Sequence, residues 1–146
     1  MLNVSRLKGC KRIACIFLVC LLPAGSAGVF AQTSKSTVTA TPLLTKELIG
    51  VPGKEAVMLS VEYLPGGESM PHRHDAQVFL YVVEGSIVTQ VEGQAPVTLT
   101  AGQTFYEAPG DIHKTARNAS KTEPAKLVVF FVKDVGKPIS RPVAAN

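Results

Sequence analysis

The stretch Gly66–Gly85, GGESMPHRHDAQVFLYVVEG, contains the strongest structural signals of this chain. It begins in the turn signal Pro65-Gly66-Gly67, places histidines at His72 and His74, and continues into the apolar run Val78–Val83. Side chains at positions i and i+2 of an extended strand point to the same side, so both imidazoles can converge on one point. The apolar run has no polar face, which predicts a strand that is covered on both sides.

The rest of the chain repeats this pattern of short strands and turns. Val57–Tyr63 alternates apolar and polar residues, and Leu127–Val132 is apolar on both faces. Turn signals recur about every eight to twelve residues, and no window of helical period reaches three turns. The pattern therefore predicts an all-β fold, either a sandwich or a closed barrel.

Aromatic residues of the predicted strands are expected in the core or in the wall of a cavity. They are Phe79, Tyr81, Phe105, Phe130 and Phe131. Two further tyrosines, Tyr63 and Tyr106, could each line a pocket.

The first 31 residues have the composition of a secretory signal peptide. Four basic residues precede the apolar run Ile13–Leu22, which ends at Pro23 and is followed by small residues up to Ala31. Cleavage after Ala31 fits best, and cleavage after Ala27 is the second choice. A transmembrane anchor would need about 20 apolar residues, twice the length of this run. We therefore expect an exported protein, periplasmic or extracellular, with no stable membrane anchor after cleavage.

Charge and cysteine content change when the leader is removed. The whole chain has 15 Lys and Arg against 11 Asp and Glu, and the four basic residues of the leader account for the excess. The mature chain is thus formally neutral and has no basic run, which argues against nucleic acid as a partner. All three cysteines, Cys10, Cys15 and Cys20, lie in the leader. Disulfides and thiolate chemistry are therefore excluded from the mature protein.

The chain has three histidines, His72, His74 and His113. Imidazole nitrogen is a good ligand for zinc, iron, copper and nickel, and two imidazoles from one strand need a third group from elsewhere. Spacing alone also fits an exposed pair at a strand end without a ligand role, so the pattern leaves both interpretations open.

The surroundings of these histidines resemble the two motifs of the cupin family. Gly66-x5-His72-x-His74, followed by Gly85, resembles the first motif, G(x)5HxH(x)3–4E(x)6G, and the segment from Gly102 to His113 resembles the second, G(x)5PxG(x)2H(x)3N. The resemblance spans about Val57–Val132 and places all three histidines on the family's ligand positions. It implies a single jelly-roll β-barrel, similar to small quercetin-dioxygenase-like cupins, that holds a divalent metal ion.

The resemblance also sets the expected domain organisation. A flexible lead-in or loose edge strand at 32–42 precedes the barrel at 43–133, and an extended tail at 134–146 follows it. Because a jelly roll of this size leaves edge strands that a partner commonly covers, we expect a homodimer.

Several residues depart from the family pattern. The position of the family's glutamate ligand is Val78, which cannot bind a metal, and the adjacent Gln77 could supply an amide oxygen instead. In the second motif the proline is one position late, with Ala108 where it is expected, and the asparagine is also one position late, at Asn118, with Arg117 in its place. These shifts imply one extra residue in the second motif, which could turn Glu107 toward the cavity or away from it.

Three functions are compatible with these residues. The first is an exported metalloenzyme that polarises a small oxygen-rich molecule on a divalent ion (Fe, Mn, Zn, Ni or Cu), with dioxygenase-like cleavage, isomerisation or decarboxylation to follow. Glu107, Glu62 or Gln77 would then handle protons or orient the substrate. The second is a non-catalytic module that binds a small molecule or the metal itself, and the third is a structural barrel with an empty site.

Overall fold

A computed structural model describes residues 36–143, so the predicted signal peptide at 1–31 lies outside the described residues. The strands are β1 (Val38–Glu47), β2 (Lys54–Tyr63), β3 (Glu68–Ser69), β4 (His72–Arg73), β5 (Ala76–Glu84), β6 (Ser86–Val91), β7 (Val97–Thr100), β8 (Thr104–Glu107), β9 (Ile112–Asn118), β10 (Ala125–Asp134) and β11 (Arg141–Pro142). Within 36–143 no helix is long and apolar enough to cross a membrane.

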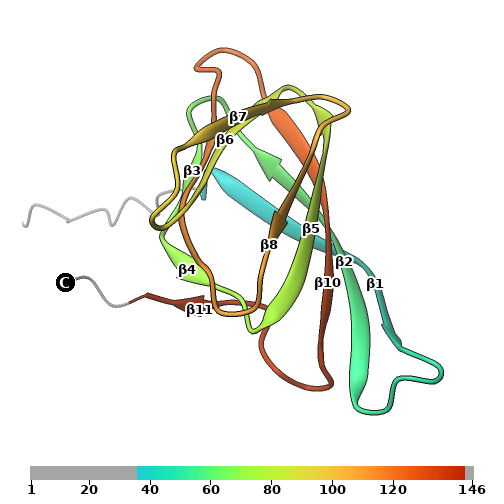
Figure 1. Cartoon of the computed structure of the whole chain (residues 1–146). Helices are drawn as coiled ribbons and strands as arrows, with labels where there is room; N and C mark the ends of the chain where they lie inside the picture. Colours follow the sequence, from blue (N-terminus) through green and yellow to red (C-terminus); the bar gives the residue numbers. More distant parts are fainter. Residues whose placement is uncertain (1–35, 144–146) are drawn as a thin grey trace, which may run out of the picture. The chain divides into compact units, whose positions relative to one another are not determined.

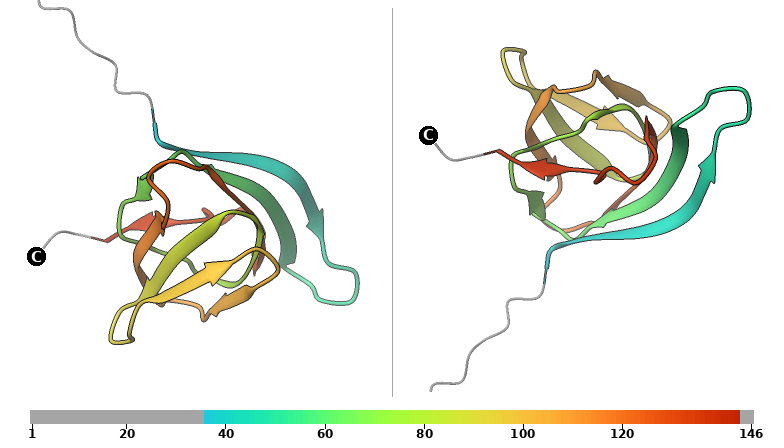
Figure 2. Two further views of the ribbon diagram at one scale, coloured as in Figure 1. Left: turned by 90° about the horizontal axis from the view of Figure 1, so that it is seen from above. Right: turned by 90° about the horizontal axis from the view of Figure 1, so that it is seen from below.

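The strands form two sheets that curve around a common interior (Figures 1 and 2). One sheet has the order β1-β2-β10-β5-β8, and the other has the order β11-β4-β9-β6-β7 with β3 beside β9. All the strand pairs are antiparallel. The all-β jelly-roll barrel predicted from the sequence is confirmed.

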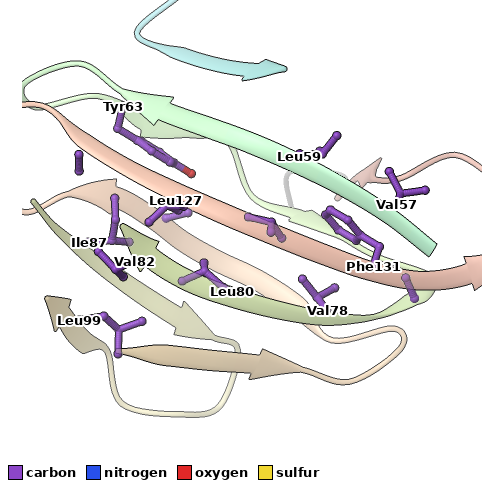
Figure 3. Close-up of a cluster of buried hydrophobic side chains, with 14 residues drawn as sticks. Val57, Leu59, Tyr63, Val78, Leu80, Val82, Ile87, Leu99, Leu127 and Phe131 are labelled. Carbon is purple, nitrogen blue, oxygen red and sulfur yellow. The ribbon is translucent and has the colours of Figure 1, made fainter. Parts of the chain in front are cut away.

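The core fills the interior with every second residue of the long strands. Val78, Leu80 and Val82 of β5 point inward against Leu127 and its neighbours on β10, while Ile87 and Leu99 pack from the second sheet (Figure 3). Burial of each such side chain contributes about 1.5–3 kcal/mol, which makes this alternation the main determinant of strand register.

The outer face of β5 differs from the expectation of burial on both sides. Phe79 and Tyr81 are 44% and 47% exposed, whereas Phe131 is buried and Phe105 and Phe130 are half-buried. Of the two predicted locations, core or cavity wall, the core is therefore wrong for Phe79 and Tyr81, which instead line a second, open pocket on the outer face of this sheet. A barrel strand has only one inner face, and no second layer of the described chain covers the outer face of this sheet.

The strand β1 begins within the segment expected to precede the barrel. Val38 pairs with Tyr63, and the pairing with β2 continues to Glu47 with one irregularity between Pro42 and Leu44. Residues 38–42 are thus an edge strand, the alternative that the sequence left open beside a flexible lead-in. The β-branched residues Val38, Thr39 and Thr41 favour this extended conformation.

The late asparagine of the second motif has a structural role. Asn118 is buried, and its amide nitrogen donates to the carbonyls of Tyr63, Leu64 and Glu123 at 3.4, 3.2 and 2.8 Å. Its Oδ1 accepts the backbone N–H of Ser120. These bonds hold the ends of β2 and β9 together at the end of the barrel remote from the histidines.

Candidate metal centre

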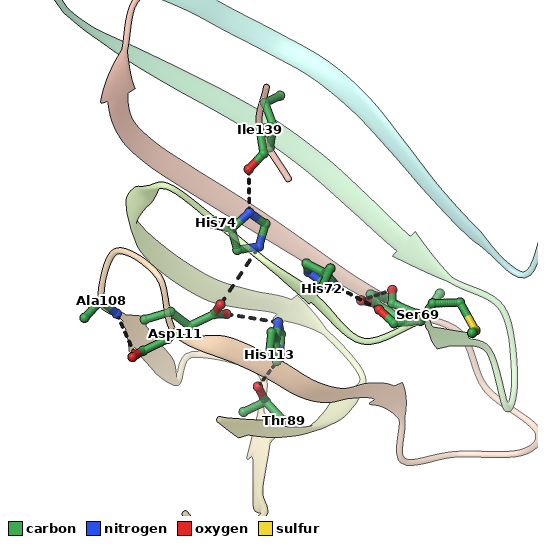
Figure 4. A network of polar contacts seen from close by, with 11 residues as sticks. Ser69, His72, His74, Thr89, Ala108, Asp111, His113 and Ile139 are labelled. Atoms are coloured by element: carbon green, nitrogen blue, oxygen red, sulfur yellow. Dashed lines mark hydrogen bonds and ion pairs between the residues drawn. The ribbon is translucent and has the colours of Figure 1, made fainter. Parts of the chain in front are cut away.

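The three histidines come together because β4 and β9 are paired. His72 on β4 lies directly opposite His113 on β9, and His74 follows β4 by one residue. The His72 ring centroid is 4.8 Å from that of His74 and 5.1 Å from that of His113. One ligand nitrogen from each ring lies within 4.8 Å of the others (Figure 4). The convergence expected from the His-x-His spacing is confirmed.

Hydrogen bonds fix the orientation of two of these rings. Nδ1 of His72 lies 2.8 Å from the carbonyl oxygen of Met70, and Nδ1 of His74 lies 2.6 Å from that of Ile139. Because a carbonyl can only accept, each Nδ1 must carry the proton and donate it. Each Nε2 is left with a free lone pair, the arrangement that metal-binding histidines commonly adopt.

His113 has partners at both ring nitrogens. Its Nε2 lies 2.7 Å from Oγ1 of Thr89, and its Nδ1 lies 3.1 Å from Oε1 of Glu107. Burial, reinforced by the neighbouring imidazoles of His72 and His74, lowers the pKa of His113 to about 3. Burial also lowers the pKa of His74. Both rings are therefore neutral at neutral pH, the form that binds metal ions.

Glu107 points into the site from the end of β8. Its side chain is 2% exposed, and its Oε2 lies 3.9 Å from Nε2 of His74 without a hydrogen-bond partner. Burial, with a smaller effect of Asp111, raises the pKa of Glu107 to about 7. Three imidazoles and a carboxylate with an orphaned oxygen make a donor set that fits a divalent cation.

The other two candidate residues do not reach the histidines. Gln77 is exposed on the outer face of β5, because alternation along the strand turns Val78 inward. Glu62 is also exposed and forms an ion pair with Lys126 at 2.8 Å. The structure therefore does not bring the amide of Gln77 or the carboxylate of Glu62 to this site.

The histidines line a cavity of about 400 Å³ inside the barrel. Its walls are mostly apolar, and the Tyr63 hydroxyl, 3.0 Å from Oγ of Ser69, is among its few polar groups. Residues of the C-terminal tail, including Ile139, cover one side, and Arg141 holds that tail through an ion pair with Asp75 at 2.6 Å. The other lining residues include Val61, Leu80, Leu127, Val129 and Phe131.

Sequence reasoning did not identify Thr89 as part of the site. Thr89 is fully buried and lies between the inward-facing residues Ile87 and Val91 of β6. A hydroxyl residue on the inner face of a barrel strand needs a partner, and this parity is the signal that could have revealed it. No sequence signal could have identified the carbonyl of Ile139 as the partner of His74, because its position depends on the path of the C-terminal tail.

Solved structures share this fold. An uncharacterized conserved protein with a double-stranded beta-helix domain from Klebsiella pneumoniae is 20% identical, with a TM-score of 0.59 covering 74% of this chain and 88% of that one. The DMSP lyase DddQ from Ruegeria pomeroyi is 17% identical, with a TM-score of 0.59 covering 73% of this chain and 51% of that one. A recombinant oxalate oxidase in complex with glycolate is 24% identical, with a TM-score of 0.58 and coverages of 75% and 57%.

At this level of identity, the structural likeness shows the fold alone. No curated protein matches the chain. The family described as "Cupin domain" matches residues 59–131, half of the chain, and this segment holds all three histidines. This chain belongs to the cupin family.

Proposed function

We propose that this protein holds a divalent metal ion on His72, His74 and His113 and binds a small oxygen-rich molecule beside it. The observation that carries the proposal is the meeting of three imidazoles at an internal cavity, two of them with Nδ1 tied to backbone carbonyls. Imidazole ligands suit iron, zinc, nickel and copper, and the carboxylate of Glu107 beside them also suits manganese, so we propose that the ion is one of these five.

The cavity wall narrows the class of ligand. It is largely apolar, and no lysine or arginine is among its lining residues in the described part of the chain. An anionic head group could therefore be neutralised only by the bound ion. A bound divalent ion would supply Lewis-acid polarisation of a ligand oxygen or activation of dioxygen. We propose a ligand with an apolar body and an oxygen-rich head.

Two side chains in the cavity can exchange a proton with such a ligand. Glu107 carries the carboxyl group nearest the histidines, and Tyr63 offers a hydroxyl whose pKa is raised by burial. Tyr63 and Ser69 together can orient a ligand oxygen, because each hydroxyl can donate or accept. Oxygen-dependent cleavage, isomerisation and decarboxylation are the reactions that this arrangement supports.

The alternative is a non-catalytic module that only binds its ligand. It is supported by the absence of a carboxylate at position 78 and by the apolar cavity, which can hold a molecule without acting on it. Oxygen uptake and product formation should be followed over a panel of diketones, flavonols and sugar acids. Turnover by the metal-loaded protein supports the enzyme, and binding without turnover supports the module.

Metal content tests the site itself. The mature protein, purified without added chelator, should contain one equivalent of a divalent metal by mass spectrometry of the elements. His72→Ala and His113→Ala should lose it, because each removes one of three ligands. Gln77→Ala, which changes an exposed outward residue of β5, is the matched control and should keep it. Metal below one equivalent that no substitution changes would overturn the proposal.

We further propose that the protein is exported. The basic, apolar and small-residue segments of residues 1–31 support this. N-terminal sequencing of the protein from the extracytoplasmic fraction should begin at Gln32, or at Gly28 if the second cleavage site is used. Full-length protein confined to the cytoplasm would contradict export.

We also propose a homodimer. The outer face of β5, β8 and β10 carries a cluster of aromatic rings. The ring centroid of Phe79 lies 5.3 Å from that of Tyr106 and 6.2 Å from that of Phe130. An exposed apolar cluster of this kind commonly marks an interface. Light scattering should give twice the mass of one chain, and Phe79→Asp should give a single chain. A wild-type monomer at high concentration would contradict the dimer.

A further inference from the structure

Among residues 36–143, Glu107 is a buried carboxylate with no lysine or arginine partner. Its contacts with ionisable groups are to Nδ1 of His113 at 3.1 Å and to Nε2 of His74 at 3.9 Å, and its Oε2 has no hydrogen-bond partner. No lysine or arginine of the described chain lines the cavity on which it opens. A carboxylate removed from water in this way is costly unless it holds a proton or a cation reaches it, and the cavity beside Glu107 gives a cation access.

The strand register explains how Glu107 reaches the histidines. Glu107 on β8 pairs directly with Val78 on β5, and both side chains line the cavity. Directly opposed side chains of an antiparallel pair have Cβ atoms about 4.5–5.5 Å apart on one face of the sheet. A carboxylate at 107 therefore enters the cavity beside the point where a side chain at 78 enters it.

We infer that Glu107 is the fourth protein ligand of the metal ion, an anionic donor supplied by β8 because β5 has Val78 at the opposing position. The inference rests on the proposed three-histidine site and completes its donor set. It turns a site of three neutral donors into one that carries a negative charge, which raises its affinity for a divalent cation.

The contacts favour a ligand role over a role in orienting His113. Two ligand atoms on one ion, with bonds of about 2.1 Å, lie about 3.0–3.4 Å apart. Oε1 of Glu107 lies 3.1 Å from Nδ1 of His113, and the second oxygen faces the free Nε2 of His74. Orientation of His113 is already provided by Thr89 at its other nitrogen. A carboxylate that only oriented His113 would leave its second oxygen buried without a partner, whereas a bound metal ion would give that oxygen a partner.

The test is a titration of the metal-free mature protein with Co²⁺, followed by its visible absorption spectrum. Glu107→Gln keeps the size of the side chain and removes its charge, so it should weaken Co²⁺ binding at least tenfold and shift the absorption bands. Glu62→Gln, an exposed carboxylate outside the cavity, is the matched control and should bind as the wild type does. Circular dichroism confirms that each variant is folded.

A second variant places the carboxylate on the opposing strand. Val78→Glu in the Glu107→Gln background should recover at least half of the lost binding energy, measured as the logarithm of the affinity ratio. If Glu107 acted only by orienting His113, the new carboxylate would not restore binding, since the lost contact with His113 would remain lost. Absence of rescue in a folded double variant therefore overturns the ligand role.

The outcomes separate this inference from the proposed function. Wild-type binding that His113→Ala abolishes, with Glu107→Gln binding unchanged, overturns the role of Glu107 and leaves the three-histidine site standing. No Co²⁺ binding by the wild type overturns both. Weakened binding in Glu107→Gln with rescue by Val78→Glu supports both.

Discussion

Two buried carboxylates of this barrel, Glu55 and Glu107, have opposite surroundings. Glu55 is 8% exposed and contacts the buried amine of Lys133, and its Oε1 also accepts the backbone N–H of Gly136. The amine of Lys133 also donates to the carbonyls of Asp134 and Lys137 at 3.0 and 2.5 Å. Glu107 is 2% exposed, faces neutral imidazoles, and has one oxygen without a partner.

The pKa values follow from these surroundings. The hydrogen bond from Lys133 lowers the pKa of Glu55, whereas burial raises that of Glu107 to about 7. A buried carboxylate with its own cation is part of the framework of the fold. A buried carboxylate without one, beside imidazoles with free lone pairs, marks a place for a cation that the chain does not itself supply.

The largest effect on stability is expected when Glu55 loses its cation and is left, like Glu107, without one. Lys133→Met keeps the apolar stem but leaves the carboxylate of Glu55 without its cation, and breaking such a buried pair is strongly destabilising. We expect Tm to fall by about 10 °C or more. Lys126→Met removes the lysine of an exposed ion pair and should lower Tm by less than about 3 °C. Equal shifts in the two variants would contradict the comparison.

A smaller effect is expected from pH in the metal-free protein. Unfolded chains release the Glu107 proton near its ordinary pKa of 4.5, whereas the folded protein holds it until about pH 7. Between these values the unfolded state binds fewer protons, so the free energy of unfolding falls as pH rises, by up to about 3 kcal/mol.

The variant Glu107→Gln isolates this contribution. His113, with its pKa lowered to about 3, adds stability as pH rises from there to 6.5. Burial and the imidazoles of His72 and His74 cause this shift, so we expect the same contribution in Glu107→Gln. The free energies of unfolding in urea of the wild type and of Glu107→Gln should therefore diverge progressively as pH rises from 4.5 to 7. The wild type should become less stable relative to the variant. A constant difference across this window would show that Glu107 ionises as it does in the unfolded chain.

Metal addition should stabilise the wild type by an amount that is set by the free metal concentration. At a concentration 100 times the Kd, the gain in unfolding free energy is about 2.7 kcal/mol. His113→Ala should show no such gain, while Lys133→Met should gain as much as the wild type does, because its altered pair is not part of the site. Tm measured with and without excess metal tests this. A gain that persists in His113→Ala would place the bound metal elsewhere.

The smallest of these effects is expected from the hydroxyl of Thr89, which contacts His113. Thr89→Val removes the 2.7 Å contact with Nε2 while keeping the shape of the side chain. Loss of such an outer contact costs about tenfold in metal affinity. Thr98→Val, on an exposed position of β7, should leave affinity unchanged. Equal affinities for Thr89→Val and the wild type would show that the hydroxyl of Thr89 has no part in metal binding by His113.

The histidines were predictable from the sequence because their positions follow from local rules. The i, i+2 spacing of His72 and His74 sets one side of an extended segment, and the second motif supplied His113. The strands were predictable for the same reason, since turn residues and apolar runs mark them directly.

The exposure of Phe79 and Tyr81 and the inward direction of Glu107 were not predictable in this way. An apolar run fits burial on one face or on both, and only the number of layers in the assembled barrel decides. The inward direction of Glu107 follows from its pairing with Val78. That pairing depends on the register of β8 against β5, and the second motif, which includes β8, departs here from the family pattern.

The sequence by itself therefore determined the all-β fold class, the three imidazole donors and the neutral, cysteine-free character of residues 32–146. The tertiary structure alone decided which carboxylate joins the histidines, that Gln77 does not, and that the carbonyl of Ile139 fixes the ring of His74. The physical reason is that residue spacing sets directions only along one strand. These contacts instead join β8 to β9, and the segment after β4 to the C-terminal tail, so they depend on strand register and on the path of the tail across the barrel.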